Sequence, residues 1–341
     1  YNRNVTVRIA SGIDGRVTNN GTQHFHEGGK YNPENRLMEY YTRTGESGIY
    51  VMQCFGHRLF LEGMEIRPFK RPVMERRYAG MKTEVDVPVG QTLAVDKICA
   101  VFTSRDTEAA EGEKLWETSE RGRKTALRYV ESGYDFLKKR NHKEWKQYWN
   151  KTDILIRSRN DYDQLAVRFA LYHLNIMADR QDDRAGIGAK GLSGEGHEGH
   201  SFWDTEMFLI PFYLLTDPEE ARKLLIYRGK SLPGARDKAY RNGYKGAMFP
   251  WESAGLTDGE VTPERGEADP MTGEERLILT GKKELHISAD ISYAVWHYYM
   301  ATGDKKFMRE WGEEIILATA VFWADRVEWD GSTCHIRDII G

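Results

Sequence analysis

The first hundred residues alternate between hydrophobic and polar positions with a period of two. Val5, Val7 and Ile9 are separated by polar residues, and the same alternation returns at 83–89. This period is typical of strands with one buried face. Turn-forming sequences separate the runs at 12–15 and at 19–21. We predict a partial antiparallel β-sandwich domain over residues 1–104.

The period then changes from two to about 3.6. Residues 107–147 are rich in Glu, Lys, Arg and Ala, with apolar residues at roughly helical spacing. We therefore predict a helical linker over 105–150, followed by a helical domain over 151–341. Packed helices are predicted at 161–179, from Asp217-Pro218 onward, at 287–301 and at 309–327.

Composition narrows the class of protein. The chain has 341 residues, 40% of them hydrophobic, and a formal net charge of −3. It can fill a packed core, and its balanced charge argues against a nucleic-acid partner held by a basic face. The sequence has no apolar run long enough for a transmembrane helix, so we predict no membrane partner. Its three cysteines form no disulfide framework or zinc pattern, which favours a cytoplasmic location.

The two ends of the sequence are abrupt. Tyr1 stands where a methionine would begin a natural chain, and the strand-like residues 335–341 have no closing helix after them. We therefore expect the sequence to be a segment of a longer protein.

Two long loops rich in glycine and aromatic residues interrupt the helical region, at 186–202 and 242–283. Loops of this length inside a compact domain are usually functional. The first contains Gly-x-Gly-x-x-Gly at 194–199, but no strand precedes it and its two glutamates would repel a pyrophosphate, so we predict no cofactor. His197 and His200 lack the metal-binding step and a third ligand, so we predict no metal site.

A tryptophan stands beside a carboxylate twice: Trp203-Asp204 directly follows the first loop, and Trp251-Glu252 lies in the second. An aromatic face packs on the C–H groups of a pyranose ring, and a carboxylate accepts hydrogen bonds from its hydroxyls. The ordinary alternative is that Asp204 caps a helix while both tryptophans belong to the core. Because the pair occurs twice, the sequence favours a carbohydrate cleft in which the two pairs converge. Six further acids, which we interpret as a solvated loop, are Glu260, Glu264, Glu267, Asp269, Glu274 and Glu275.

Several stretches together resemble one known family. They lie at 11–19, 199–206, 216–218, 227–228, 232–236, 243–254, 284–294 and 335–338. In this order they resemble glycoside hydrolase family 65, which includes phosphorylases of maltose, kojibiose, nigerose and trehalose. The resemblance implies an N-terminal β-sandwich, a helical linker and an (α/α)6 barrel, of which this chain would hold the first half.

The resemblance also implies roles for particular residues. Trp203 and Asp204 would hold the non-reducing glucosyl unit, and Trp251 and Glu252 would lie near the scissile bond and the acceptor. Ser288 falls at a position that varies with acceptor choice in the family, so we include it among the substrate-binding residues.

The family's general acid is a glutamate in a motif whose first residue matches Gly341. We therefore predict that this chain contains no catalytic residue, and that alone it is inactive and prone to aggregate.

The implied reaction is inverting phosphorolysis of an α-linked glucose disaccharide to β-glucose 1-phosphate, with inorganic phosphate as co-substrate and no cofactor. Two alternatives stay open: a hydrolase of the same family, similar to acid trehalases, and a non-catalytic carbohydrate-binding protein on the same scaffold. The resemblance is compatible with a homodimer.

Overall fold

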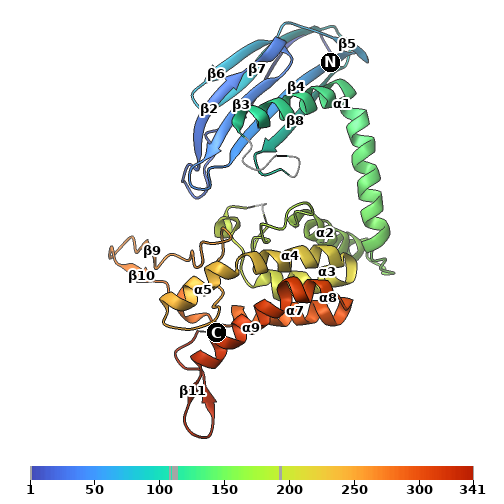
Figure 1. Ribbon diagram of the computed structural model, residues 1–341. Coiled ribbons are helices and arrows are strands. Elements are labelled where there is room, and N and C mark those ends of the chain that lie inside the picture. The colour runs from blue at the N-terminus through green and yellow to red at the C-terminus, as the bar shows by residue number, and fades with distance from the viewer. Residues whose placement is uncertain (1, 107–108, 110–113, 192–193, 341) are drawn as a thin grey trace. The chain divides into compact units, whose positions relative to one another are not determined.

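The computed structural model describes residues 2–106, 109, 114–191 and 194–340 (Figure 1). It divides into two compact units, Tyr1–Asn150 and Lys151–Gly341, which we describe separately. The first unit is built from antiparallel strands followed by a helix, and the second is built largely from helices. The predicted fold class, an antiparallel β domain followed by a helical domain, is confirmed.

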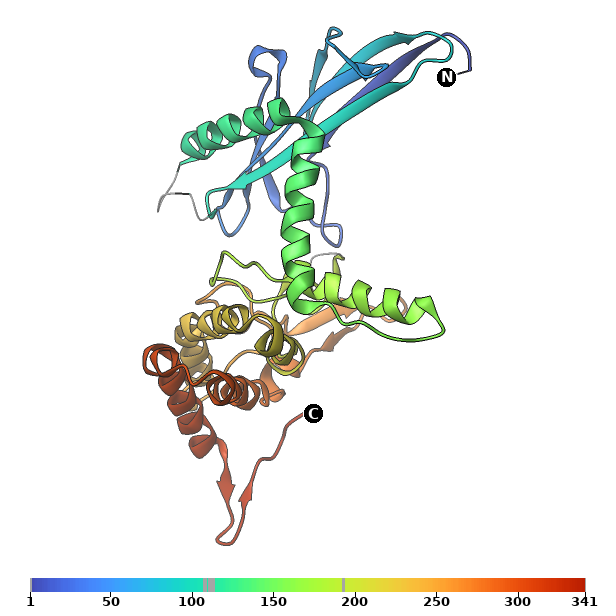
Figure 2. The same cartoon turned by 90° about the vertical axis from the view of Figure 1, so that its right-hand side faces the viewer.

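The first unit contains two antiparallel sheets (Figures 1 and 2). One has the order β1-β7-β6; the other has the order β2-β3-β4-β5, with β8 also paired to β4. The strands are β1 (Val5–Asp14), β2 (Phe25–Tyr31), β3 (Met38–Thr44), β4 (Tyr50–Leu61), β5 (Met64–Ile66), β6 (Arg71–Glu75), β7 (Tyr78–Val87) and β8 (Leu93–Thr103).

The inner faces of the two sheets form a common core. Met38, Tyr40 and Phe55 from β3 and β4 pack against Ala79 and Met81 from β7, and all five side chains are at most 2% exposed. Alternate residues along β7 are buried and exposed, because successive side chains point to opposite faces of a strand. The alternation of hydrophobic and polar residues in the sequence therefore identifies the buried face of β7.

One predicted turn is wrong and one is correct. Residues 12–14 do not turn but continue β1 opposite β7, with Gly12 paired to Gly80. A Cβ on Gly12 would lie 2.4 Å from the hydroxyl of Tyr78, so Gly12 leaves room for a ring rather than for a turn. At 19–21 the chain does turn: Asn20 and Gly21 have φ of 46° and 78°, between the bridged residues Asn19 and Thr22.

Helix α1 (Leu115–Thr152) contains a sharp kink (Figure 2). The kink is at Gly133, whose φ of 78° is the left-handed conformation that glycine adopts without strain. Before the kink, Ala126 and its neighbours pack on the outer face of the second sheet, against Met52 and Cys54. The six residues 107, 108 and 110–113 of the predicted linker lie outside the described residues.

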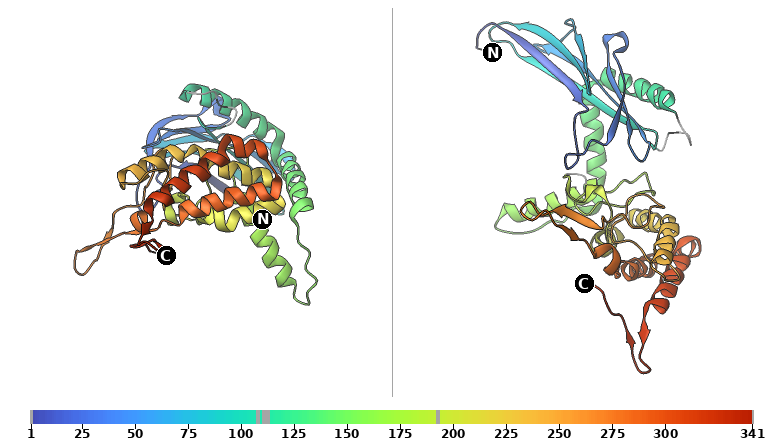
Figure 3. Two further views of the ribbon diagram at one scale, coloured as in Figure 1. Left: turned by 60° about the horizontal axis from the view of Figure 1, so that its bottom comes forward. Right: turned by 90° about the vertical axis from the view of Figure 1, so that its left-hand side faces the viewer.

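The second unit packs its helices around one apolar core. Figures 1 and 3 show α4, α7 and α9 side by side, with buried residues from α3, α4, α7 and α9 in a single cluster. The helices are α2 (Asp161–Met177), α3 (Ile210–Thr216), α4 (Pro218–Lys230), α5 (Leu232–Arg241), α6 (Thr280–Lys283), α7 (Ile287–Thr302), α8 (Lys305–Phe307) and α9 (Glu313–Arg326). Short irregular turns are η1 (Pro33–Asn35) in the first unit, and η2 (Gly196–Gly199) and the π-helical η3 (Thr205–Leu209) and η4 (Met308–Gly312) here. Short strand pairs are β9 (Arg265–Ala268) with β10 (Glu275–Leu277), and β11 (Glu328–Trp329) with β12 (Cys334–His335).

The predicted helix start at Asp217-Pro218 is confirmed, although not by the expected capping bond. Helix α4 begins at Pro218, where the missing N–H costs nothing. The carboxylate of Asp217 makes no capping hydrogen bond and instead pairs with Arg180 at 2.9 Å. Over the described ranges, no helix has both the length and the apolar character needed to cross a bilayer.

Candidate functional site

The two loops that carry the aromatic–acid pairs run side by side. Ser201 and Ser253 exchange backbone hydrogen bonds, each N–H donating to the other's carbonyl over 2.9 Å. Both serines are buried. This short bridge joins the segments next to Trp203-Asp204 and Trp251-Glu252, although the two pairs are far apart in sequence.

The two tryptophans both contact one histidine. The ring of His286 is 4.7 Å from Trp203 and 6.0 Å from Trp251 between ring centroids, with edge-on geometry in both cases. Both indoles also pack against the main helical core. The structure thus joins the two predicted aromatics through His286, a residue that sequence analysis did not select.

Carboxylates hold both nitrogens of the His286 ring. Its Nδ1 is 2.7 Å from Oδ2 of Asp290, one turn along α7, and its Nε2 is 3.2 Å from Oε2 of Glu284. The contact with Asp290 is a hydrogen bond that orients the ring, and Glu284 places a second carboxylate beside it.

Glu252 forms a pair with His200. Oε1 of Glu252 is 2.8 Å from Nδ1 of His200, and both side chains are at least three-quarters buried. The hydrogen bond to Glu252 raises the pKa of His200 above its ordinary value, against the opposing effect of burial. Within the described residues no group of three or more His, Cys, Asp or Glu could hold a metal ion, so we assign His200 a hydrogen-bonding role.

Asp204 does not act as a helix cap. It stands at the start of η3, but its side chain makes no capping hydrogen bond, and we find no partner for its carboxylate in the described part of the chain. Asp204 is partly exposed. A partly exposed carboxylate without a protein partner remains available to accept hydrogen bonds from a ligand.

Ser288 lies beneath the second loop. It is fully buried, and its Oγ accepts a hydrogen bond from the backbone N–H of Phe249 at 2.9 Å. This position does not support the predicted direct contact between Ser288 and a substrate. The Phe249 backbone connects Ser288 to the segment that carries Trp251.

A buried ion pair fastens the first loop to α4. Arg228 donates to both carboxylate oxygens of Glu206, at 2.7 and 2.9 Å, and both side chains are at most 1% exposed. The same guanidinium donates to the carbonyl of Phe202 at 2.8 Å and to Oγ of Ser253 at 3.1 Å. One side chain thus holds the residue before Trp203 and the residue after Glu252.

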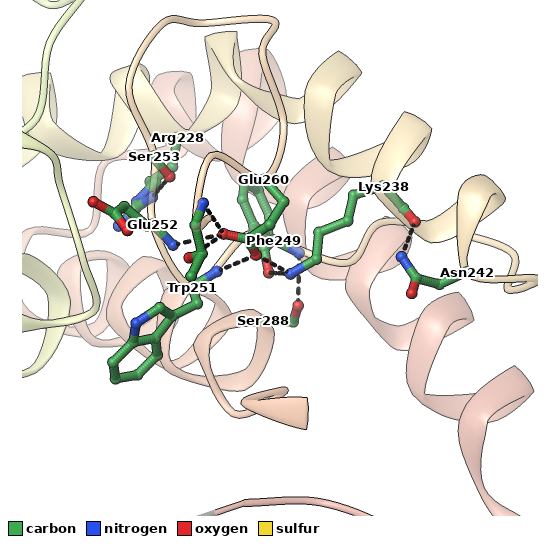
Figure 4. A network of polar contacts seen from close by, with 10 residues as sticks. Arg228, Lys238, Asn242, Phe249, Trp251, Glu252, Ser253, Glu260 and Ser288 are labelled. Atoms are coloured by element: carbon green, nitrogen blue, oxygen red, sulfur yellow. Dashed lines mark hydrogen bonds and ion pairs between the residues drawn. The ribbon is translucent and has the colours of Figure 1, made fainter. Parts of the chain in front are cut away.

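A second buried pair fastens the other loop (Figure 4). Nζ of Lys238 on α5 is 2.5 Å from Oε2 of Glu260, and its side chain is 3% exposed. Burial lowers the pKa of Lys238, and the neighbouring carboxylate opposes that shift. Glu260 also accepts from the backbone N–H groups of Trp251 and Glu252, so its interpretation as a solvated acid was wrong.

Four residues that shape this region were missed: His286, Arg228, Lys238 and Glu260. For Arg228 a signal was present, because it follows Leu224 and Leu225 on the apolar face of α4, where a buried charge needs a partner. Nothing in the local sequence distinguishes Glu260 from the neighbouring exposed Glu264.

Two family models match the chain. Residues 1–148 match the model for "Glycosyl hydrolase family 65, N-terminal domain". Residues 168–341 match the model for "Glycosyl hydrolase family 65 central catalytic domain". The chain belongs to glycosyl hydrolase family 65.

Curated family 65 relatives span different activities. The chain is 44% identical to a kojibiose phosphorylase of Halothermothrix orenii and 37% identical to one of Escherichia coli, in both cases over 98% of this chain and 43% of the relative. It is 34% identical to a kojibiose hydrolase of Flavobacterium johnsoniae, over 88% of this chain and 40% of that protein. The chain therefore spans less than half the length of these family members.

A solved structure shares the fold. A putative kojibiose phosphorylase from the human microbiome superposes with a TM-score of 0.84 at 19% identity, covering all of this chain and 42% of that one.

Proposed function

We propose that the protein to which this chain belongs catalyses inverting phosphorolysis of an α-linked glucose disaccharide, releasing β-glucose 1-phosphate. The observation that carries the proposal is the pairing of Trp203-Asp204 with Trp251-Glu252 around His286 in a family 65 catalytic domain. Aromatic edges and faces beside free carboxylate oxygens suit a pyranose, which presents C–H groups and hydroxyls together.

Each pair then has its own task. Trp203 and Asp204 hold the non-reducing glucosyl unit, with Asp204 accepting from its hydroxyls. Trp251 and Glu252 lie toward the scissile bond and the acceptor, with His200 orienting the Glu252 carboxylate. Ser288 acts on the acceptor indirectly, through the Phe249 backbone.

The substrate that we propose first is kojibiose, an α-1,2-linked disaccharide. Kojibiose phosphorylases are among the similar relatives, and a 1,2-alpha-glucosylglycerol phosphorylase of Bacillus selenitireducens is 35% identical over 72% of this chain. The two kinds of enzyme have different acceptors but the same linkage, so the linkage is the better supported part of the proposal.

In the proposed reaction, an oxygen of inorganic phosphate attacks the anomeric carbon from the face opposite the leaving group. The bond from that carbon to the glycosidic oxygen breaks, and a general acid protonates the departing oxygen. We assign no described residue to that acid. The site residues position the glucosyl unit and stabilise its developing charge.

Hydrolysis is the second candidate, because the kojibiose hydrolase relative is 34% identical. The two candidates are separated by assaying a full-length protein, meaning one that carries these residues at the length of the curated relatives. Kojibiose, nigerose, maltose and trehalose are each supplied with and without phosphate. Phosphate-dependent release of β-glucose 1-phosphate supports phosphorolysis, release of glucose regardless of phosphate supports hydrolysis, and no turnover of any sugar would reject both.

The Asp204→Asn variant of the full-length protein tests the glucosyl subsite. Losing a charged acceptor of sugar hydroxyls should cost about 1.5–3 kcal/mol, or roughly ten- to a hundredfold in kcat/KM. Its melting temperature should not change, because Asp204 makes no capping bond. Glu219→Gln, at an exposed acid of α4, is the control. Wild-type turnover by Asp204→Asn would remove Asp204 from the site.

A further inference from the structure

All the acceptor capacity of Glu260 is used inside the protein. Its Oε2 accepts from the N–H of Trp251 at 2.9 Å and from Lys238, while its Oε1 accepts from the N–H of Glu252 at 3.1 Å. Thr262 adds two more donors to Oε1, its N–H at 3.2 Å and its hydroxyl at 2.7 Å. Figure 4 shows the Trp251 indole pointing away from this carboxylate. Glu260 therefore holds the backbone of Trp251 and Glu252 and makes no hydrogen bond to their side chains.

Lys238 holds Glu260 from the other side and extends the same network. Its Nζ contacts Oε2 of Glu260 and lies 3.4 Å from the carbonyl of Phe249, while the Phe249 N–H donates to Ser288. The segment from Phe249 to Glu252 is thus attached at consecutive backbone groups to α5, α7 and Glu260. A loop fixed in this way can present side chains to a ligand without losing entropy on binding.

We propose that Glu260, braced by Lys238, is a positioning residue that sets the acceptor side of the site through Trp251 and Glu252. The inference rests on the proposed function, because it takes these two residues as the acceptor-side contacts. Glu260 itself does not touch substrate.

The charge pattern makes glutamate the required residue at this position. Donors approach both oxygens: Trp251 and Lys238 on one, Glu252 and Thr262 on the other. A glutamine has the same shape but only one acceptor oxygen, so its amide NH₂ would face donors on one side or the other. Glu260→Gln therefore breaks half of the network without creating a cavity.

Glu260 can also be reached by small molecules. It lines a cavity of about 380 Å³ together with Lys238, Asn242, Thr262 and Glu264. This space is large enough for a formate ion. In a Glu260→Ala variant, added formate can supply the two oxygens that Trp251 and Glu252 have lost.

The test measures the full-length protein in the synthetic direction, with β-glucose 1-phosphate as donor and glucose as acceptor. Glu260→Gln should raise the acceptor KM about tenfold or more and leave the donor KM within about twofold, because only the acceptor-side loop is released. Formate at millimolar concentration should lower the acceptor KM of Glu260→Ala. Glu264→Ala is the matched control, since Glu264 lines the same cavity but is exposed and pairs with Lys282 at 3.1 Å.

Equal changes in both KM values, or a loss of melting temperature with no change in either, would make Glu260 merely structural and overturn the proposal. Absence of rescue by formate would equally count against it.

Hydrogen exchange separates this failure from a failure of the proposed function. The amides of Trp251 and Glu252 should be protected in the wild type and exchange at least tenfold faster in Glu260→Gln, whether or not the protein acts on sugars. If the wild type were inactive but showed this exchange pattern, the proposed function would be rejected and the positioning role of Glu260 would stand. If exchange at Trp251 and Glu252 were the same in Glu260→Gln as in the wild type, the positioning role would be rejected.

Discussion

Removing Arg228 tests whether the first loop depends on its buried ion pair. Arg228→Met would leave Glu206 as an uncompensated charge at 0% exposure, and would deprive the Phe202 carbonyl and the Ser253 hydroxyl of a donor. Breaking a buried pair from one side costs about 3–5 kcal/mol, and an unsatisfied buried carbonyl costs about 1–3 kcal/mol more when the site cannot relax. We expect a total of about 4 kcal/mol, since the two penalties share one cavity and do not add in full.

For a helical unit of this size, about 4 kcal/mol corresponds to a fall of roughly 8–16 °C in melting temperature. Calorimetry of the full-length protein, following the transition of the helical unit, provides the measurement. The control is Arg236→Met, because Arg236 pairs with Glu314 at 2.8 Å but both side chains are at least half exposed. Loss of such an exposed pair should cost less than about 1 kcal/mol.

The double variant Arg228→Met/Glu206→Gln completes the cycle. Removing the second charge should recover part of the loss, because replacing a whole buried pair costs far less than breaking it. The reasoning would be refuted if Arg228→Met were as mild as Arg236→Met. It would also be refuted if the double variant were as unstable as the sum of the single variants.

Three further predictions concern pH and backbone conformation. Glu252 raises the pKa of His200, so the stability that this pair contributes is complete below pH 6.5 and is lost as the pH rises through the pKa of the folded state. NMR titration should find the His200 pKa above 6.5 in the wild type and lower in Glu252→Gln. An equal pKa in both proteins would contradict this. Burial raises the pKa of Glu220 from 4.5 to about 7, so between these pH values the folded state holds a proton that the unfolded state has released. The free energy of unfolding should therefore fall by up to about 3 kcal/mol from pH 4.5 to pH 7. Glu220→Gln should remove this pH dependence of the melting temperature, and an unchanged dependence would assign it to other groups. Gly246 has a φ of 77°, and a Cβ at this position would lie 2.3 Å from the carbonyl oxygen of Ala318. Calorimetry of Gly246→Ala should therefore show the helical unit destabilised by at least about 2 kcal/mol. A neutral effect would show that the loop has room to move.

The sequence was most informative where structure depends on local periodicity. Alternation at 83–89 locates the inner face of β7, and the apolar spacing at 287–301 locates α7, because each pattern reports which side of a single element is buried. Glycine was a less reliable guide to the positions of turns. Gly12 lies within β1, near its C-terminal end, and the Tyr78 ring packed over it explains its identity, which no local rule can anticipate.

The parts of the candidate site that could be predicted are those that are neighbours in the sequence. Trp203-Asp204 and Trp251-Glu252 are visible as neighbours in sequence, and the structure brings them together, while the single cleft expected around them stays a prediction. The contacts that hold them join Glu206 to a residue on the next long helix, and Trp251 to a carboxylate that follows nine positions later. Partners of this kind depend on how the chain folds back, which single-sequence patterns do not encode.

In both loops, some charged side chains bond the loop backbone, whereas Asp204 does not. In each loop the backbone is tied to a charged side chain, the Phe202 carbonyl to the buried Arg228 and the Trp251 N–H to the partly buried Glu260, and each charge has an opposite partner. Apolar residues of the same volume could match these pairs in stability but could not bond a loop's N–H and C=O groups. The pairs therefore contribute conformational specificity, whereas Asp204 makes no capping bond and its contact with a ligand stays a prediction. On this argument, converting either pair to well-packed hydrophobic residues should lower the melting temperature less than breaking the pair from one side, because no charge is left unpaired. It should still impair sugar binding, because the loop's N–H and C=O groups lose their partners. Unimpaired sugar binding in such a variant would show that the pair serves stability alone.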